Sequence, residues 1–340
     1  MDSMSFIWEG SRVFEETVLP LRIKGPVRRR LLFPVSEILQ VTSYDKKTIF
    51  EENKDFYIKD GDFVVSENTS MNIMPYSVYN FPEKPQTDPI PCKTGGYLFF
   101  TEGTYIVDRQ YRITYKHDPS DFYVPEKQPD KLPRFKKKLN DGSPVTIGVF
   151  GDSIAVGCNS SKILGIEPFS EPWPIQLAMA IQKKYKSEVS LINRSQGGTT
   201  SGWGAENVKA MLGDCDIDLA IINFGMNDGA GVSVERYIEN LRLIANILKK
   251  ECYGCEIVFI SPSQPNPLVD DAQYHRDRTP FMYFLADEFG DSVAIAPMNE
   301  LHNKILLRKD YYDMTANNIN HPNDFLASVY GQLVFYTITP

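Results

Sequence analysis

The stretch VFGDSIAVG, residues 149–157, leads from a run of apolar residues into a Gly-Asp-Ser step where a strand is expected to give way to a helix. The run that it ends, PVTIGVFG (144–151), has the apolar and β-branched content of a buried strand. Ser153 is then either a turn serine that caps the next helix or a nucleophile at the end of a sheet. The rest of the chain decides between these two interpretations.

Downstream of this stretch, apolar runs of strand length alternate with segments of helical periodicity. Strands are expected at 144–151, 188–194, 217–225, 255–262 and 292–298, and helices at 173–185, 204–213, 234–251 and 280–290. Near-continuous apolar strands that alternate with helices are typical of a parallel sheet covered on both faces. The sequence therefore predicts an α/β domain with a five-stranded parallel sheet over residues 144–340.

The first 118 residues have a different pattern, with short runs of aromatic and β-branched residues. The segment DFYIKDGDFVV (55–65) places two such runs around Asp60-Gly61, which predicts a hairpin because both central positions of the tight turn need positive φ. Residues 1–118 are therefore expected to form an accessory β-sandwich or jelly roll. Residues 119–143 mix four prolines with charged residues, and they predict a Pro-rich linker without regular structure.

Composition narrows the classes of partner. The formal net charge is -8, and the two dense basic runs, 28–30 and 136–138, are expected on solvated surfaces. No nucleic-acid partner is predicted, because phosphate binding needs a basic face. The amino terminus lacks a signal-peptide pattern and no segment has the apolar length to span a bilayer, so we expect a cytoplasmic protein without a membrane partner. The sequence does not indicate the oligomeric state.

Four candidate catalytic residues follow expected strands. Ser153 follows the first strand, Gly198 in NRSQGGTTSG the second, Asn227 in NFGMNDG the third, and His321 in NNINHPND comes a short stretch after the fifth. Ligands of an open α/β sheet bind outside the carboxyl ends of the strands, so these residues are expected to converge. A serine hydroxyl needs a base to take its proton, and an imidazole accepts and returns a proton near neutrality. The main-chain N–H groups of Ser153 and Gly198 and the Asn227 amide are candidate donors to an oxyanion.

These four blocks resemble those of the SGNH, or GDSL, serine esterase (acylhydrolase) family. The resemblance implies a flavodoxin-like three-layer α/β/α fold and ester hydrolysis through an acyl-serine intermediate, with no metal and no cofactor. It makes Ser153 the nucleophile, His321 the general base and then acid, and Ser153, Gly198 and Asn227 the oxyanion hole. The lack of a second glycine after Ser153 argues against the G-x-S-x-G turn of the α/β-hydrolase fold.

The expected substrate is a small acyl ester, with acetyl on a carbohydrate favoured. This expectation comes from the similarity to carbohydrate O-acetyl esterases that carry an amino-terminal β-sandwich. Two alternatives stay open: a thioesterase or lysophospholipase that acts on longer acyl chains, and a carbohydrate-binding protein whose hydrolase domain has decayed. The expected partner is thus a small molecule or an oligosaccharide.

One position departs from the family pattern, because Asn318 stands where the family usually has the triad aspartate. An asparagine cannot balance the charge of an imidazolium, so either the enzyme is slow or another group orients His321. Some family members work as Ser-His dyads with a backbone carbonyl as the orienting group, and that arrangement is favoured here. Asn318 itself, Asp313 and Asp324 are the other candidates, with Asp324 in the first turn of a helix expected to begin at Pro322.

Four further side chains are candidates for shaping the site or contacting substrate: Asp152, Thr199, Trp203 and Asp228. Asp152 is expected to accept hydrogen bonds from loop amides and so to shape the turn at the nucleophile. Trp203 either walls the substrate site or packs under a loop.

Overall fold

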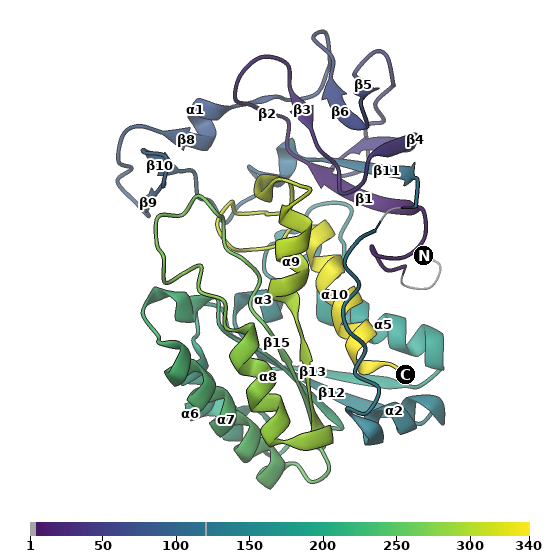
Figure 1. The fold of residues 1–340 in the computed structure, drawn as a ribbon, viewed down its shortest axis with the longest axis vertical. Coiled ribbons are helices and arrows are strands. Elements are labelled where there is room, and N and C mark those ends of the chain that lie inside the picture. Colours follow the sequence, from purple (N-terminus) through teal and green to yellow (C-terminus); the bar gives the residue numbers. More distant parts are fainter. Residues whose placement is uncertain (1–4, 120) are drawn as a thin grey trace.

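The carboxy-terminal region is built on one five-stranded parallel sheet in the computed structural model, which describes residues 5–119 and 121–340 (Figure 1). The strand order is β13-β12-β14-β15-β16, the 2-1-3-4-5 order of flavodoxin-like folds. All four neighbouring pairs are parallel. The strands are β12 (Val145–Gly151), β13 (Val189–Asn193), β14 (Leu219–Asn223), β15 (Glu256–Ile260) and β16 (Val293–Ala296). The predicted α/β fold with five parallel strands is confirmed.

Helices cover both faces of this sheet and complete three layers. Because successive strand residues point to opposite faces, Phe150 and Ile222 pack in one apolar cluster, whereas Val149 and Ile221 pack in another. The helices on the first face are α6 (Ser201–Leu212), α7 (Val234–Glu251) and α8 (Thr279–Glu288). Those on the second face are α2 (Pro133–Asn140), α5 (Trp173–Tyr185), α9 (Met298–Leu306) and α10 (Asp324–Ile338). The shorter turns are α3 (Ser153–Val156), α4 (Ser161–Leu164), η2 (Asn227–Ala230), η3 (Gly290–Ser292) and η4 (Tyr311–Asp313).

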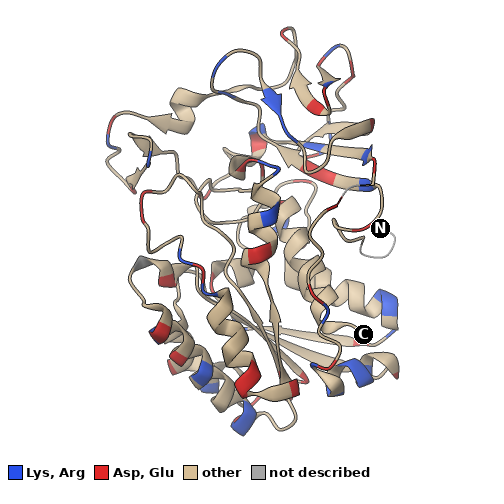
Figure 2. Cartoon of the chain, viewed as in Figure 1, with Lys and Arg blue, Asp and Glu red and all other residues tan. Residues whose placement is uncertain are grey.

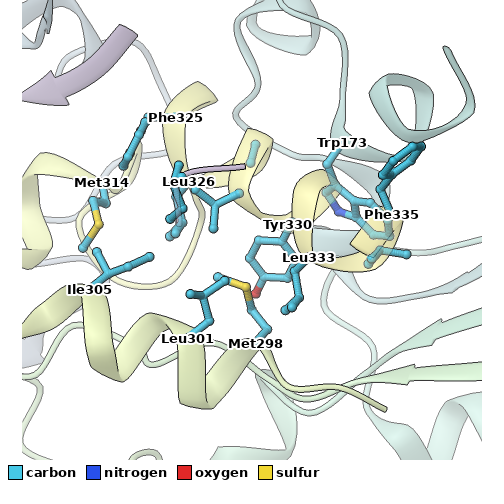
Figure 3. Close-up of a cluster of buried hydrophobic side chains, with 14 of the residues drawn as sticks. Trp173, Met298, Leu301, Ile305, Met314, Phe325, Leu326, Tyr330, Leu333 and Phe335 are labelled. Atoms are coloured by element: carbon cyan, nitrogen blue, oxygen red, sulfur yellow. The ribbon is translucent and has the colours of Figure 1, made fainter. Parts of the chain in front are cut away.

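Helix α10 is the central helix of the second face, and it is buried almost all round. A helix that is apolar on all sides is expected in a core, and this one is. Figure 3 shows Tyr330 and Leu333 of α10 pointing toward Met298 and Leu301 of α9. On its other side, Trp173 stacks on Tyr330 with 6.1 Å between ring centroids.

The amino-terminal region is β-rich and mainly antiparallel, as predicted. One three-stranded sheet consists of β1 (Arg12–Val18), β11 (Tyr111–His117) and β4 (Val35–Ser43). A second consists of β3 (Arg28–Arg29), β6 (Asp62–Val65) and β5 (Phe56–Lys59), and β5 and β6 form the predicted hairpin, with φ of 53° at Asp60 and 82° at Gly61. The remaining elements are β8 (Asn80–Phe81), β10 (Tyr97–Leu98) and β9 (Ile90–Pro91) in a third sheet, the parallel pair β2 (Leu21–Arg22) and β7 (Met74–Pro75), α1 (Tyr76–Tyr79) and η1 (Val107–Arg109).

Residues 121–143 of the Pro-rich segment lie along the α/β region and contain the regular helix α2, which we did not expect there. Pro133 takes the first helical position, where the missing N–H costs nothing. Phe135 and Leu139, one turn apart, are buried. Upstream, the Gln128 amide donates to the Ile295 carbonyl at 2.7 Å and accepts from the Ile295 N–H at 3.2 Å. This side chain thus satisfies backbone groups on the outer edge of the sheet.

The β-rich region packs directly on the α/β region. Lys309 lies 2.9 Å from Glu16 of β1, and both side chains are fully buried. The Thr17 hydroxyl donates to the Asp313 carbonyl at 2.6 Å. The two regions therefore share buried polar contacts as well as a continuous apolar cluster.

The expectation that both basic runs lie on solvated surfaces is wrong at one residue in each. Arg29 is buried with its guanidinium 3.3 Å from Asp313. Lys136 is buried and donates to the Gln128 carbonyl at 2.6 Å. Over the outer helices α6, α7 and α8, basic and acidic side chains are interspersed (Figure 2). In the part of the chain that the structure describes, no helix is both long and apolar enough to cross a membrane.

Candidate active site

Strand β12 ends at Gly151 and turns at once into the short helix α3. Asp152 is the N-cap of this helix, because its carboxylate accepts a hydrogen bond from the Ile154 N–H at 2.9 Å. Ser153 is therefore the first helical residue and not the cap. Its hydroxyl is left to face the neighbouring loops.

The imidazole of His321 meets that hydroxyl. His321 Nε2 lies 2.8 Å from Ser153 Oγ, and both residues are buried. The loop that carries His321 is held by its own polar groups: the His321 N–H donates to Asn317 Oδ1 at 3.0 Å, and the Thr315 hydroxyl donates to the His321 carbonyl at 3.0 Å. A base at this distance can take the serine proton, so the geometry fits an activated nucleophile.

The other ring nitrogen faces two side chains that the sequence did not predict. His321 Nδ1 lies 2.5 Å from Asn159 Oδ1 and 3.1 Å from Glu102 Oε2. Asn159 Nδ2 in turn donates to the Glu102 carbonyl at 3.1 Å. Burial alone raises the pKa of Glu102, but the hydrogen bond and charge of His321 and the bonds from Asn317 and Asn159 outweigh it and hold that pKa below its ordinary value.

Asn318, the residue at the family's aspartate position, points elsewhere. Its Nδ2 donates to the Phe99 carbonyl at 2.8 Å, and its Oδ1 accepts from Asn266 at 3.2 Å. Its backbone is in the left-handed region, with a φ of 74°. Within residues 5–119 and 121–340, the partners of His321 Nδ1 are thus side chains and not the backbone carbonyl that we expected.

The other two candidates for orienting the ring are also engaged elsewhere. Asp313 accepts from the Leu19 N–H at 2.7 Å. Asp324 accepts from the Ser161 N–H at 2.9 Å and pairs with Arg112. The helix that we expected to begin at Pro322 begins two residues later, because the Asn323 side chain caps it.

The glycine loop after β13 lies against Ser153. A Cβ on Gly197 would stand 3.7 Å from Ser153 Cβ, and the Gln196 N–H donates to the Gly151 carbonyl at 3.0 Å. Gly198 has a φ of 76°, and a Cβ there would meet no heavy atom within 4 Å. This open position leaves room for a substrate beside the backbone.

Asn227 lies at the same edge of the sheet. Its Nδ2 donates to the Thr199 carbonyl at 2.8 Å. A primary amide has two N–H donors, so one remains for an oxyanion. The bond to Thr199 fixes the plane of the amide and joins the Asn227 loop to the glycine loop.

Asp152 and Asp228 stabilise the backbone near the site by accepting hydrogen bonds. The buried Asp228 carboxylate accepts from the Ser201 N–H at 3.0 Å and from the Ser201 hydroxyl, and burial raises its pKa. Burial likewise raises the pKa of Asp152 to about 7. Trp203 of α6 packs on Phe150 of strand β12, with 5.5 Å between the ring centroids.

Glu102 and Asn159 are the residues near the histidine that sequence reasoning missed. Asn159 follows Ser153 by six residues, so its place after the nucleophile turn was a usable signal. Glu102 lies in the segment FFTEGTY, 219 residues before His321 in the region expected to be accessory. No motif or periodicity in the sequence connects it with the site.

Comparison with known proteins gives one family and several distant structures. The model of the GDSL-like lipase/acylhydrolase family matches residues 149–324. No curated protein matches the sequence. A two-domain esterase (CEX) active on acetylated mannans, co-crystallised with mannopentaose, is 18% identical with a TM-score of 0.49; the alignment covers 61% of this chain and 52% of that chain. The chain thus spans about half the length of that protein.

Two other solved structures match this chain at similar identity and are covered over nearly their whole length. A putative GDSL-like lipase from Parabacteroides merdae is 18% identical, with 57% of this chain and 97% of that chain covered and a TM-score of 0.46. A variant of Axe2, an acetyl-xylooligosaccharide esterase from Geobacillus stearmophilus, is 15% identical, with 58% and 96% covered and a TM-score of 0.45.

The family match spans more than half of the chain, and it contains Ser153, Gly198, Asn227 and His321. It covers the segment in which the nucleophile turn, the glycine loop and the histidine loop meet. The chain therefore belongs to the GDSL-like lipase/acylhydrolase family.

Proposed function

We propose that this chain hydrolyses small acyl esters, acetyl esters of carbohydrates first among them, through an acyl-serine intermediate. The hydrogen bond of 2.8 Å between Ser153 Oγ and His321 Nε2 carries the proposal. It joins a hydroxyl at the end of β12 to an imidazole before α10, which is the pairing that serine acyl transfer requires.

In the first half-reaction, Ser153 Oγ attacks the ester carbonyl carbon as its proton passes to His321 Nε2. The tetrahedral oxyanion accepts hydrogen bonds from the N–H groups of Ser153 and Gly198 and from the free N–H of Asn227. Such donors typically contribute about 3 kcal/mol each to the transition state. The bond between the acyl carbon and the alcohol oxygen then breaks, and the imidazolium returns the proton to the leaving alcohol.

In the second half-reaction, water attacks the acyl-serine carbonyl and gives its proton to His321 Nε2. The bond between the acyl carbon and Ser153 Oγ breaks, Oγ takes the proton back, and the carboxylic acid leaves. One base thus serves both steps, and no metal or cofactor enters the cycle.

The carbohydrate part of the proposal draws on the resemblance to carbohydrate O-acetyl esterases with an amino-terminal β-region. Acetylated manno-oligosaccharides and xylo-oligosaccharides are the substrates to test first, because they are the substrate classes named for two of the structures compared above.

The test is acetate release from p-nitrophenyl acetate and from these oligosaccharides. We expect Ser153→Ala to abolish release and to prevent labelling by a fluorophosphonate. Ser160→Ala is the matched control, since this buried hydroxyl has no hydrogen-bond partner among the described residues. Faster hydrolysis of octanoyl than of acetyl esters would favour the thioesterase or lysophospholipase alternative. No release by the wild type would favour a decayed, carbohydrate-binding protein.

A further inference from the structure

We propose that Glu102, in the β-rich region, is the positioning residue of His321 and supplies the negative charge that Asn318 cannot supply. This inference rests on the proposed function, because it concerns how the same histidine works. It makes the β-rich region part of the catalytic apparatus and not an accessory to it.

Two side chains bind His321 Nδ1, and only one of them can carry a charge. When Nδ1 carries the proton, it donates to Asn159 Oδ1 at 2.5 Å and to Glu102 Oε2 at 3.1 Å, and Nε2 is left as an acceptor toward Ser153. The amide oxygen of Asn159 fixes this tautomer but has no charge. The carboxylate of Glu102 stabilises the imidazolium that forms when Nε2 takes the serine proton.

Hydrogen bonds join the Glu102 loop to the histidine loop. Asn317 Nδ2 donates to Glu102 Oε1 at 3.2 Å, and Asn318 Nδ2 donates to the Phe99 carbonyl at 2.8 Å. Asn159 Nδ2 holds the Glu102 carbonyl from the other side at 3.1 Å. Three asparagines thus fix the backbone and the carboxylate of a loop that comes from another region of the chain.

Among the titratable groups around His321, Glu102 is the one placed to stabilise a positive charge on the ring. It is the one carboxylate, among the residues that the structure describes, within 4.0 Å of a His321 ring nitrogen. The Asp152 carboxylate bonds to the α3 backbone, and burial raises its pKa to about 7, so it is less ionised at neutral pH than Glu102. Cys158 lies near Glu102, and burial raises the pKa of its thiol, which keeps it neutral. The lowered pKa of Glu102 agrees with an ionised carboxylate at neutral pH.

The expected loss of activity on removal of the Glu102 charge depends on how far that carboxylate is exposed to solvent. The Glu102 side chain is 54% exposed, so solvent screens its charge. Loss of both charge and tautomer costs roughly 10⁴-fold in the serine-protease case, but here Asn159 keeps the tautomer. We therefore expect Glu102→Gln to lower kcat/KM for p-nitrophenyl acetate about tenfold, a loss that solvent screening keeps well short of that figure.

The test separates charge from shape with two substitutions in the full-length protein. Glu102→Gln keeps the length and loses the charge, whereas Glu102→Asp keeps the charge and loses the length. We expect the acidic limb of the kcat/KM profile to move to lower pH in Glu102→Gln, because the imidazolium is less favoured, and to stay near its wild-type position in Glu102→Asp. Glu67→Gln, an exposed carboxylate of the same region, is the control and is expected to match the wild type.

Two results would overturn the inference while the proposed function stands. One is a Glu102→Gln enzyme within twofold of the wild type at every pH. The other is a Glu102→Asp enzyme that is slower than the Glu102→Gln enzyme, with the pH profile of kcat/KM unshifted in both. A purely structural role, in which side-chain length matters and charge does not, predicts that result. Urea midpoints equal to the wild type would show that both variants fold. Wild-type activity that survives Ser153→Ala would instead remove the proposed function itself.

Discussion

Arg112 of β11 and Asp324 in the first turn of α10 form a buried ion pair across the two regions of the molecule. Each side chain is only 3% exposed. The guanidinium also donates to the Tyr44 carbonyl at 2.7 Å and lies 4.2 Å from the centre of the Tyr44 ring. Because Asp324 is three residues from His321, this pair connects the β-rich region to the helix that follows the histidine loop.

Arg112→Met is expected to destabilise the fold strongly. It removes the charge but keeps much of the apolar stem, so the Asp324 carboxylate stays buried without its main partner. Breaking one half of a buried pair typically costs about 3–5 kcal/mol in the free energy of unfolding. Urea denaturation at pH 7 measures this loss.

Lys116→Met on the same strand is the matched control. Lys116 pairs with Glu37 at 2.6 Å, but these side chains are 41% and 55% exposed. An exposed pair contributes about 0–1 kcal/mol, so the control is expected to lose no more than that. Equal losses in the two variants would contradict the view that burial makes the Arg112 pair matter.

Asn227→Ala is expected to lower kcat by about 10²–10³-fold with little change in KM, because it removes a donor that acts on the oxyanion and not on the bound ester. Initial rates with p-nitrophenyl acetate give both constants. Asn207→Ala is the control: its amide also donates to a backbone carbonyl, that of Trp203 at 2.8 Å, but it lies on α6 away from the site. A loss confined to KM in Asn227→Ala would exclude the oxyanion role.

The sequence predicted the α/β region well because its signals are local. The segments 173–185 and 234–251 carry helical periodicity and are the helices α5 and α7. Gly198, Asn227 and Ser153 each follow an apolar strand, so the parallel order of the strands alone was enough to bring them to one edge.

The contacts that were not predicted arise between segments far apart in the chain. The meeting of Glu102 and His321 depends on how the β-rich region packs on the histidine loop, and no local pattern encodes that packing. The same holds for Arg29 and Lys136. Their charges predict solvent exposure, but each is buried because it binds an oxygen from a distant or folded-over segment, Asp313 for Arg29 and the Gln128 carbonyl for Lys136. At Asn318, the family pattern suggested a contact with His321, but the Asn318 side chain bonds to the Phe99 carbonyl and to Asn266.

Gly157→Ala is expected to disturb the nucleophile turn. Gly157 ends α3 with a φ of 83°, and a Cβ there would lie 2.4 Å from Pro172 Cβ and 3.2 Å from its backbone Cα. The clash adds about 1–3 kcal/mol to the backbone cost. It also displaces Pro172, and the next residue, Trp173, donates a hydrogen bond from its indole to the Ile154 carbonyl of α3. Esterase activity is therefore expected to fall together with the urea midpoint.

Gly165→Ala separates the clash from the backbone cost. Gly165 ends α4 in the same left-handed conformation, with a φ of 70°, but a Cβ there would meet nothing within 4 Å. This variant is expected to lose about 1 kcal/mol of stability and to keep its activity. If both glycine variants behaved alike, close packing at Pro172 would not be the reason for glycine at 157.

His302 is a fully buried histidine of α9 outside the site. Its Nδ1 accepts a hydrogen bond from the Gln264 N–H at 3.1 Å, which requires a neutral ring with the proton on Nε2. Burial lowers the pKa of His302 from 6.5 to about 3. Folding thus holds this imidazole neutral over a range in which the unfolded chain protonates it.

His302→Asn is expected to weaken the loss of stability in acid. Between pH 6.5 and 3, the unfolded chain binds a proton at this position that the folded chain does not, so the free energy of unfolding falls as pH falls, by at most about 1.4 kcal/mol per pH unit. Asparagine keeps an acceptor for the Gln264 N–H and does not titrate. Urea denaturation at pH 7 and pH 5 is expected to show a lower stability of the variant at pH 7, because volume is lost from the core, but a smaller drop to pH 5 than in the wild type. Equal drops would mean that the His302 ring takes up its proton without unfolding.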